Sequence, residues 1–215
     1  MISTKGELVT TIIHNEENTK TFEVRREFIG VEGEDIILLQ LFPTLGKGDE
    51  FTMDSTNRHI ITHREELNIK SIRFINLFAT RSSTRMSTRN IEIDEENLRY
   101  IEGIMQEQNF KDSRFVVAFG CTMQKCAVAD KTKESIYTLF KKYNPKGEMY
   151  QITVDKLDSK NDVAVHVLFL GIRHSNAKWR FEEFKIPKVV EEKPTKKKGR
   201  PRLVKGDEDN VLQDK

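Results

Sequence analysis

The feature that constrains this sequence most is a near-unbroken apolar run from Ile36 to Phe42, within the stretch 35–59. The run is closed by three residues that favour turns: Pro43, Gly46 and Gly48. A continuous apolar strand of this kind is typical of a parallel sheet that is covered on both faces. We therefore expect an α/β fold in which this strand is central.

The segment after this run predicts a helix over residues 54–67. Asp54, Ser55 or Thr56 can cap its N-terminus. In parallel sheets, ligands bind where the carboxyl end of a strand meets the following helix, because free backbone N–H groups point there. A small-molecule or nucleotide site is therefore expected near this loop and helix start.

The rest of the body alternates between strand and helix patterns. We predict a hairpin over residues 7–28, strands over 71–79, 114–120, 149–154 and 164–170, and helices over 94–108 and in a region ending at Tyr143. This alternation predicts a single domain over residues 1–187, a three-layer α/β/α sandwich with a central, mostly parallel sheet and an N-terminal β-hairpin. Residues 188–215 contain too few apolar side chains to pack and are expected to be disordered.

Composition excludes several classes of protein. The chain has 215 residues, of which 37% are hydrophobic and 33% charged. No apolar run approaches the roughly 18–20 residues of a membrane span. The N-terminus lacks a basic-then-apolar signal pattern, so we expect a cytoplasmic protein.

Charge is concentrated in the C-terminal segment. The chain has 36 Lys/Arg and 34 Asp/Glu, and residues 191–215 hold 8 and 6 of these, so residues 1–190 are formally neutral. The segment Lys196-Lys197-Lys198-Gly199-Arg200-Pro201-Arg202 resembles an AT-hook, a short basic element that binds the minor groove of A·T-rich DNA. Its arginines would enter the narrow groove and its lysines would contact phosphates. DNA is therefore the expected partner, and the alternative is a basic tail that binds any polyanion.

Polar side chains at strand ends are the candidate site residues. Asn76 interrupts an apolar strand, and an Arg-rich loop with Arg81, Arg85 and Arg89 follows it. A buried amide needs a hydrogen-bond partner, which in most proteins is internal. The cluster from Gly171 to Asn176 follows the last expected strand. Its Arg173, His174 and Ser175 are residue types that hold phosphate or transfer a proton.

The sequence predicts neither a cofactor nor a metal. It contains no G-x-x-x-x-G-K and no G-x-G-x-x-G pattern, so ATP and NAD are not expected. The pair His59 and His63 has i, i+4 spacing without a metalloprotease signature, and we expect it on a solvated helix face. Cys121 stands at an expected helix start, where a thiolate is favoured, but no base adjoins it.

The order of these segments resembles the domain-of-unknown-function family 1643 of bacterial and phage proteins. The family pattern has L-N-P-S-T, D-x-T, N-L-F-a-x-R, E-N, W-G and G-x-x-x-H-P in this order. The corresponding residues here are Leu41-Phe42-Pro43-Thr44, Asp54-Ser55-Thr56, Asn76-Leu77-Phe78-Ala79-Thr80-Arg81, Glu96-Asn97, Phe119-Gly120, and Gly171 with Arg173-His174-Ser175. The resemblance covers residues 7–184. It implies that Pro43, Thr56 and Asn97 also bind a ligand.

Two positions depart from the family pattern. Phe42 stands where the family has Asn, and Ser175 follows His174 where the family has Pro. If that Asn positions a water or a base, this member has altered or lost the chemistry.

A looser likeness points to the uracil-DNA glycosylase superfamily, whose members are α/β/α sandwiches that extrude a base from the duplex. Pro43 and His174-Ser175 stand at comparable places. The acid of the first glycosylase motif is missing, and Asp54 can reach the same edge from its helix start. The likeness implies Asp54 and His174 as catalytic acid/base residues. It is an analogy of fold, which supports architecture better than activity.

Three functions remain open: a nucleobase-processing enzyme associated with DNA, a catalytically silent DNA- or protein-binding regulator of phage or mobile-element origin, and an enzyme of free nucleotides. The neutral body favours the second, because a duplex-binding face usually has excess Lys/Arg. Convergence of Asp54, Asn76, Arg81 and His174 on one pocket would favour an enzyme, whereas their dispersal would count against both enzyme hypotheses.

Overall fold

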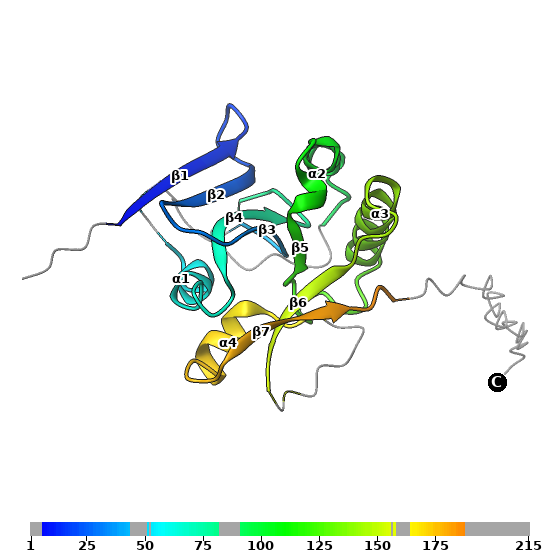
Figure 1. Cartoon of the computed structure of the whole chain (residues 1–215). Helices are drawn as coiled ribbons and strands as arrows, with labels where there is room; N and C mark the ends of the chain where they lie inside the picture. Colours follow the sequence, from blue (N-terminus) through cyan, green and yellow to red (C-terminus); the bar gives the residue numbers. More distant parts are fainter. Residues whose placement is uncertain are drawn as a thin grey trace, which may run out of the picture.

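The computed structural model describes residues 6–43, 51, 53–81, 91–155, 157 and 164–187 (Figure 1). Within these residues, seven strands form one sheet, and four α-helices and one 3-10 turn, η1 (Phe110–Asp112), accompany it. The strands are β1 (Glu7–His14), β2 (Thr21–Ile29), β3 (Glu34–Gln40), β4 (Ile69–Asn76), β5 (Arg114–Val117), β6 (Met149–Val154) and β7 (Trp179–Phe184). The helices are α1 (Ser55–Thr62), α2 (Glu95–Gln106), α3 (Ala127–Tyr143) and α4 (Val167–Arg173). The α/β class and the N-terminal hairpin, β1–β2, are confirmed.

The sheet is mixed. Its order is β1-β2-β4-β3-β5-β6-β7. The four inner strands β4, β3, β5 and β6 are parallel, whereas β1, β2 and β7 join by antiparallel pairing. The expected mostly parallel sheet is therefore limited to these four strands.

The apolar run before Pro43 forms β3 and is buried on both faces, as predicted. Ile37 and Leu39 pack in a core cluster with α2 and α3. Ile36 and Leu38 pack in a second cluster with α1 and α4. Alternate strand residues point to opposite faces, so the two clusters occupy the two faces of the sheet. Figure 1 shows α2 and α3 side by side, apart from α1 and α4.

The predicted strand over residues 164–170 is wrong, because most of this segment forms α4. Its buried Val167, Leu170 and Gly171 have the i, i+3, i+4 spacing of a helix. A short apolar run does not distinguish a strand from a buried helix. The last strand is instead β7, where the charged Arg180, Glu182 and Glu183 interrupt the apolar pattern.

The chain order creates a switch point beside β3. From β3 the chain passes through α1 to β4 on one side, and later through α2 to β5 on the other side. Connections that leave in opposite directions open a crevice at the carboxyl ends of the strands, which is where open α/β sheets bind ligands. The carboxyl ends of β3, β4 and β5 are therefore the first place to examine for a site.

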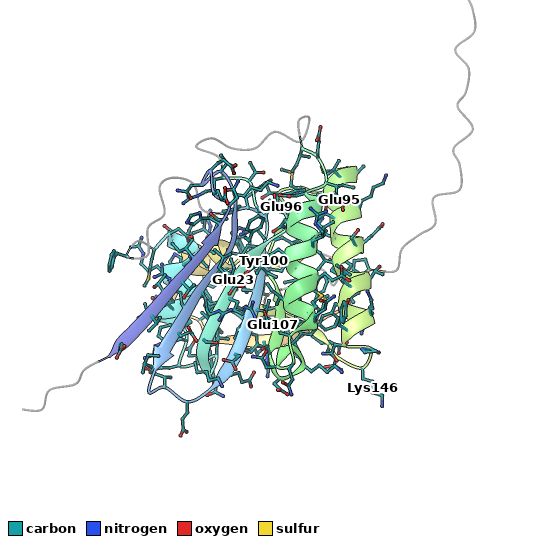
Figure 2. The ribbon with its side chains drawn as sticks, turned by 90° about the horizontal axis from the view of Figure 1, so that it is seen from above. Glu23, Glu95, Glu96, Tyr100, Glu107 and Lys146 are labelled. Atoms are coloured by element: carbon teal, nitrogen blue, oxygen red, sulfur yellow. The ribbon has the colours of Figure 1, made fainter. Side chains whose placement is uncertain are left out.

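A buried ion-pair network fastens α2 to the sheet. The fully buried Glu23 of β2 accepts hydrogen bonds from Arg73 of β4 at 2.8 and 3.0 Å and from the Tyr100 hydroxyl of α2 at 2.9 Å. Figure 2 shows Glu23 and Tyr100 beside each other, with Glu107, which also binds Arg73, farther along α2. Burial alone would raise the pKa of Glu23, but these hydrogen bonds and the charges of Arg73 and Arg25 outweigh it and lower that pKa. Glu23 is thus held as a carboxylate.

No helix in the described part of the chain is long and apolar enough to cross a membrane.

Candidate functional site

Polar side chains gather at the carboxyl ends of β3 and β4, on the face that α1 covers. Gln40 and Asn76 are the last residues of these strands and pair directly in the sheet. Along each strand they continue the alternation of Ile36, Leu38 and of Ile72, Phe74, which lie in the core cluster with α1 and α4. Both are buried, so two amide side chains stand where the apolar core ends.

The start of α1 adds two more polar side chains on this face. Asp54 is the N-cap of the helix, and its side chain accepts the backbone N–H of Asn57 at 2.7 Å. Asn57 is buried with 7% of its surface exposed, and Asn76 with 3%. The Oδ1 atoms of Asn57 and Asn76 have no hydrogen-bond partner among the described residues. A buried acceptor without a partner costs about 1–3 kcal/mol. A hydrogen-bond donor from outside the described residues would therefore stabilise both atoms.

His166 and Gly120 complete this group. Gly120 follows β5 with φ of 67°, and a Cβ at this position would lie 2.9 Å from the Cβ of His166. A side chain would therefore collide with His166 and would also strain the backbone, so glycine permits the close approach. His166 is the N-cap of α4. It is brought to the carboxyl end of β5 although the two residues are far apart in sequence.

The imidazole of His166 is held in its neutral form. Burial lowers its pKa, and the nearby charge of Asp54 opposes this only in part. Its Nδ1 accepts the backbone N–H of Leu168 at 3.1 Å. An accepting Nδ1 carries no proton, so the proton resides on Nε2, which is left as a donor. We call the group Gln40, Asp54, Asn57, Asn76, Gly120 and His166 the rim site.

Helices α1 and α4 run side by side in the same direction, which separates two of the predicted site residues. Asp54 lies near His166 at their N-terminal ends. In the middle, a Cβ at Gly171 would lie 2.1 Å from His59. At the far end, Trp179 donates its indole N–H to the backbone oxygen of His174. Asp54 and His174 are therefore separated by the length of α1, about 12 Å for eight residues.

Arg173, predicted to bind phosphate, and Ser175, predicted to bind a ligand, flank His174 and are exposed, away from the rim site. Arg81 is engaged elsewhere. Its backbone N–H donates to the oxygen of Thr19 at 2.8 Å, and its guanidinium donates to Asn18 in the β1–β2 turn. Of the four residues whose convergence would favour an enzyme, Arg81 and His174 thus lie apart from Asp54 and Asn76, which counts against an enzyme built on these four residues.

Asn97, predicted as a ligand residue, fastens α2 to β4. Its fully buried side chain donates to the backbone oxygens of Asn76 at 2.8 Å and Leu77 at 3.2 Å. The N-cap of this helix, Asp94, also accepts the N–H of Ala79 at 3.2 Å. These contacts fix the backbone that carries Asn76 into the rim site.

Pro43 and Thr56 remain beside the rim site, one buried after β3 and the other in the first turn of α1. Phe42, which replaces the Asn of the family pattern, stacks on Phe78 with ring centroids 5.3 Å apart and packs in the α2 and α3 cluster. The position contributes packing in this chain. Arg85, Arg89 and the AT-hook-like segment over residues 196–202 lie outside the described residues.

The expectation that His59 and His63 lie on a solvated face is wrong. His63 stacks on Trp179 with ring centroids 3.9 Å apart, and His59 lies against Gly171, so both serve the contact between α1 and α4. The described residues contain no group of three or more His, Cys, Asp or Glu side chains that could hold a metal ion.

A hollow of about 450 Å³ lies beside the start of α2 and is distinctly acidic. Its charged lining consists of Glu92, Asp94, Glu95, Glu96 and Lys20. Lys20 pairs with both Asp94 and Glu96 at 2.8 Å. The remaining negative charge disfavours a phosphate or a nucleic acid in this hollow.

Gln40, Asn57, Gly120 and His166 are rim residues that reasoning from the sequence alone did not select. Asn57 had a local signal, because it stands three residues after a capping Asp. His166 has none, because its apolar segment fits a strand as well as a helix, and its approach to Gly120 depends on the tertiary fold.

Comparison with known proteins identifies a family. A family model described as Protein of unknown function (DUF1643) matches residues 24–166, more than half of the chain. The match includes all six rim residues. No curated protein and no solved structure matches the chain.

Proposed function

The chain belongs to the DUF1643 family of proteins of unknown function, and we propose that it is a DNA-associated protein that binds a nucleobase at the rim site and hydrolyses the bond that links the base to its sugar. The body would supply the base site, and the basic segment 193–205 would hold DNA.

The observation that carries this proposal is the pair of buried acceptor oxygens, Asn57 Oδ1 and Asn76 Oδ1, which have no hydrogen-bond partner among the described residues. His166, at the start of α4 on the same face of the sheet, has Nε2 as its donor atom. A ligand that suits them offers N–H donors and an oxygen acceptor on one compact edge. The edges of nucleobases combine these groups. Binding such an edge would give both oxygens the partners that they lack among the described residues.

Asp54 and His166 suit the proposed hydrolysis. The carboxylate of Asp54 would orient the attacking water and accept its proton as the water bonds to the sugar carbon. The bond between sugar and base breaks with its electron pair moving to the base. A hydrogen bond from neutral His166 would stabilise the charge that develops on a base oxygen.

Base release from oligonucleotides tests the enzymatic part. His166→Asn keeps a side-chain acceptor for the N–H of Leu168 and removes the Nε2 donor, so the fold should persist while release is lost. Asp54→Asn should also lose release. His174→Asn is the matched control at the other end of α4, and it should behave as wild type. If His174→Asn loses release and His166→Asn does not, the rim site is the wrong site.

DNA association through the tail is tested on the full chain. Arg200→Ala/Arg202→Ala removes two charges from the Gly-Arg-Pro core, and Lys193→Ala/Lys205→Ala removes two outside it. For an AT-hook, preference for A·T-rich over G·C-rich duplex falls only in the first variant. Equal losses on both duplexes in both variants identify a generic polyanion-binding tail.

A catalytically silent binding protein is the second candidate. The formal neutrality of residues 1–190 and the acidic hollow beside α2 favour it, because neither attracts a phosphate backbone. Base binding without release by the wild-type chain would support this function.

A further inference from the structure

The two edges of the sheet differ in how they are protected. An edge strand presents unpaired N–H and C=O groups, and proteins usually guard it with charges, prolines or a covering segment. At one edge, β7 has three charged residues among its six, Arg180, Glu182 and Glu183. At the other edge, β1 has no charged residue, proline or glycine between Leu8 and Ile13.

The composition of β1 favours strand pairing. Val9, Thr10, Thr11, Ile12 and Ile13 form an unbroken series of β-branched residues. Among the described residues, β1 pairs with β2 alone, and Figure 2 shows it as the outermost strand. Val9 exposes 37% of its surface, and Thr11 is also exposed. Within the described residues, this edge therefore lacks the usual protection against a further strand.

We propose that a second copy of this chain pairs antiparallel with β1, which continues the sheet across a two-fold axis. In a continuous antiparallel pair, directly opposed residues point to the same face of the sheet. A pair related by a two-fold axis must therefore place one residue of the strand opposite the same residue of the second copy, and we call this residue the centre of the register. Centred on Thr11, Val9 lies opposite Ile13 of the second copy, and threonine lies opposite threonine. Such β-branched and Thr–Thr pairs are favourable.

The neighbouring register centred on Thr10 is less suitable. It places the charged Glu7 opposite Ile13 and Val9 opposite Thr11, and the Thr10 hydroxyl is already engaged by Arg26. Centring on Thr11 leaves Glu7 opposite position 15, beyond the end of the strand. The sequence of β1 is thus complementary to an antiparallel copy of itself.

Sedimentation velocity of the full chain over a concentration series tests this pairing. The wild type should show a monomer–dimer equilibrium. Thr11→Lys and Thr11→Glu each place like charges at the axis and should raise the dimer dissociation constant at least about tenfold. An equimolar mixture of the two variants should dimerise again, because opposite charges then meet. Thr138→Lys and Thr138→Glu, at an exposed position of α3, are the matched controls and should dimerise as wild type.

A cross-link keeps the test decisive if a charged variant does not fold. In a Cys121→Ser background, Thr11→Cys should form an intermolecular disulfide on mild oxidation, whereas Thr138→Cys should not. A wild-type chain that stays monomeric overturns the proposal. So does a dimer that persists in both Thr11 charge variants, or a Thr11→Cys chain that does not cross-link.

Discussion

Replacing Glu23 by glutamine should be among the most destabilising single changes on the α2 side of the sheet. Glu23 is fully buried and accepts hydrogen bonds from Arg25, Arg73 and Tyr100. Glutamine keeps one carbonyl oxygen but turns an NH₂ group toward guanidinium groups that also donate. Breaking a buried ion pair by removing one partner costs about 3–5 kcal/mol, because the other charge is left buried.

A second carboxylate that binds Arg73 provides a matched control. Glu107 also binds Arg73, but 38% of its side chain is exposed. Solvent screens such a pair, so Glu107→Gln should lower the free energy of unfolding by only about 0.2–1 kcal/mol. Tyr100→Phe, which removes one neutral donor from Glu23, should cost about 1–2 kcal/mol.

The pH dependence separates a lost charge from lost packing. The pKa of Glu23 is lowered in the folded state, so its stabilisation is complete above the ordinary value of about 4.3 and disappears as the pH falls through the lowered value. The difference between wild type and Glu23→Gln should therefore shrink in acid. If packing alone were lost, this difference would not change with pH.

Urea unfolding measures these differences with two probes. Far-UV circular dichroism follows the whole fold, and the single tryptophan, Trp179, reports from the other face of the sheet, where it is fully buried. Coincident transitions support a two-state analysis. Equal losses in Glu23→Gln and Glu107→Gln would refute the reasoning, as would a difference that is independent of pH.

Three further predictions concern the rim site. Gly120→Ala should lower the free energy of unfolding by about 1–3 kcal/mol in urea titrations, because φ is positive and the new Cβ meets His166. Burial lowers the pKa of His166 in the folded state, so the contribution of its neutral form to the free energy of unfolding should be complete above about pH 6.5 and should fall as the pH drops toward the lowered pKa. His166→Asn should remove this part of the pH dependence of stability. Asn97→Leu, which loses two hydrogen bonds to the backbone after β4, should cost about 1–3 kcal/mol and weaken base binding by calorimetry. Wild-type binding in Asn97→Leu would show that this clamp does not position Asn76.

The sequence predicts those features of the fold that local chemistry determines. The apolar run before Pro43 indicates a strand covered on both faces, and β3 is such a strand. The aspartates at the two expected helix starts, Asp54 and Asp94, are the N-caps of α1 and α2. Each of these features depends on contacts within a few residues, so its pattern is readable without the tertiary fold.

The rim site depends on connections that no local pattern contains. Asn57, Gly120 and His166 belong to three different segments, and only the passage of the chain on both sides of β3 brings their elements together. The segment from Ala164 to Ile172 is apolar enough for a strand or a helix. As a strand it would place His174 at the sheet edge, whereas as α4 it brings His166 there. A charged residue can also be used elsewhere, as Arg81 is by the β1–β2 turn.

Two copies of one local pattern show how the face of the sheet decides the role of a residue. Both α1 and α2 begin with D-x-x-N, Asp54 to Asn57 and Asp94 to Asn97, and each Asp accepts the N–H of its Asn. In α2 the amide turns to the backbone of β4 and binds two carbonyl oxygens there. In α1 the same pattern lies on the face of Gln40, Asn76 and His166, and the side-chain oxygens of both Asn57 and Asn97 have no partner among the described residues. The copy in α2 therefore anchors its helix through the amide nitrogen of Asn97. If Asn57 binds a ligand as proposed, exchanging Asn57 for leucine should weaken ligand binding more than it weakens the fold.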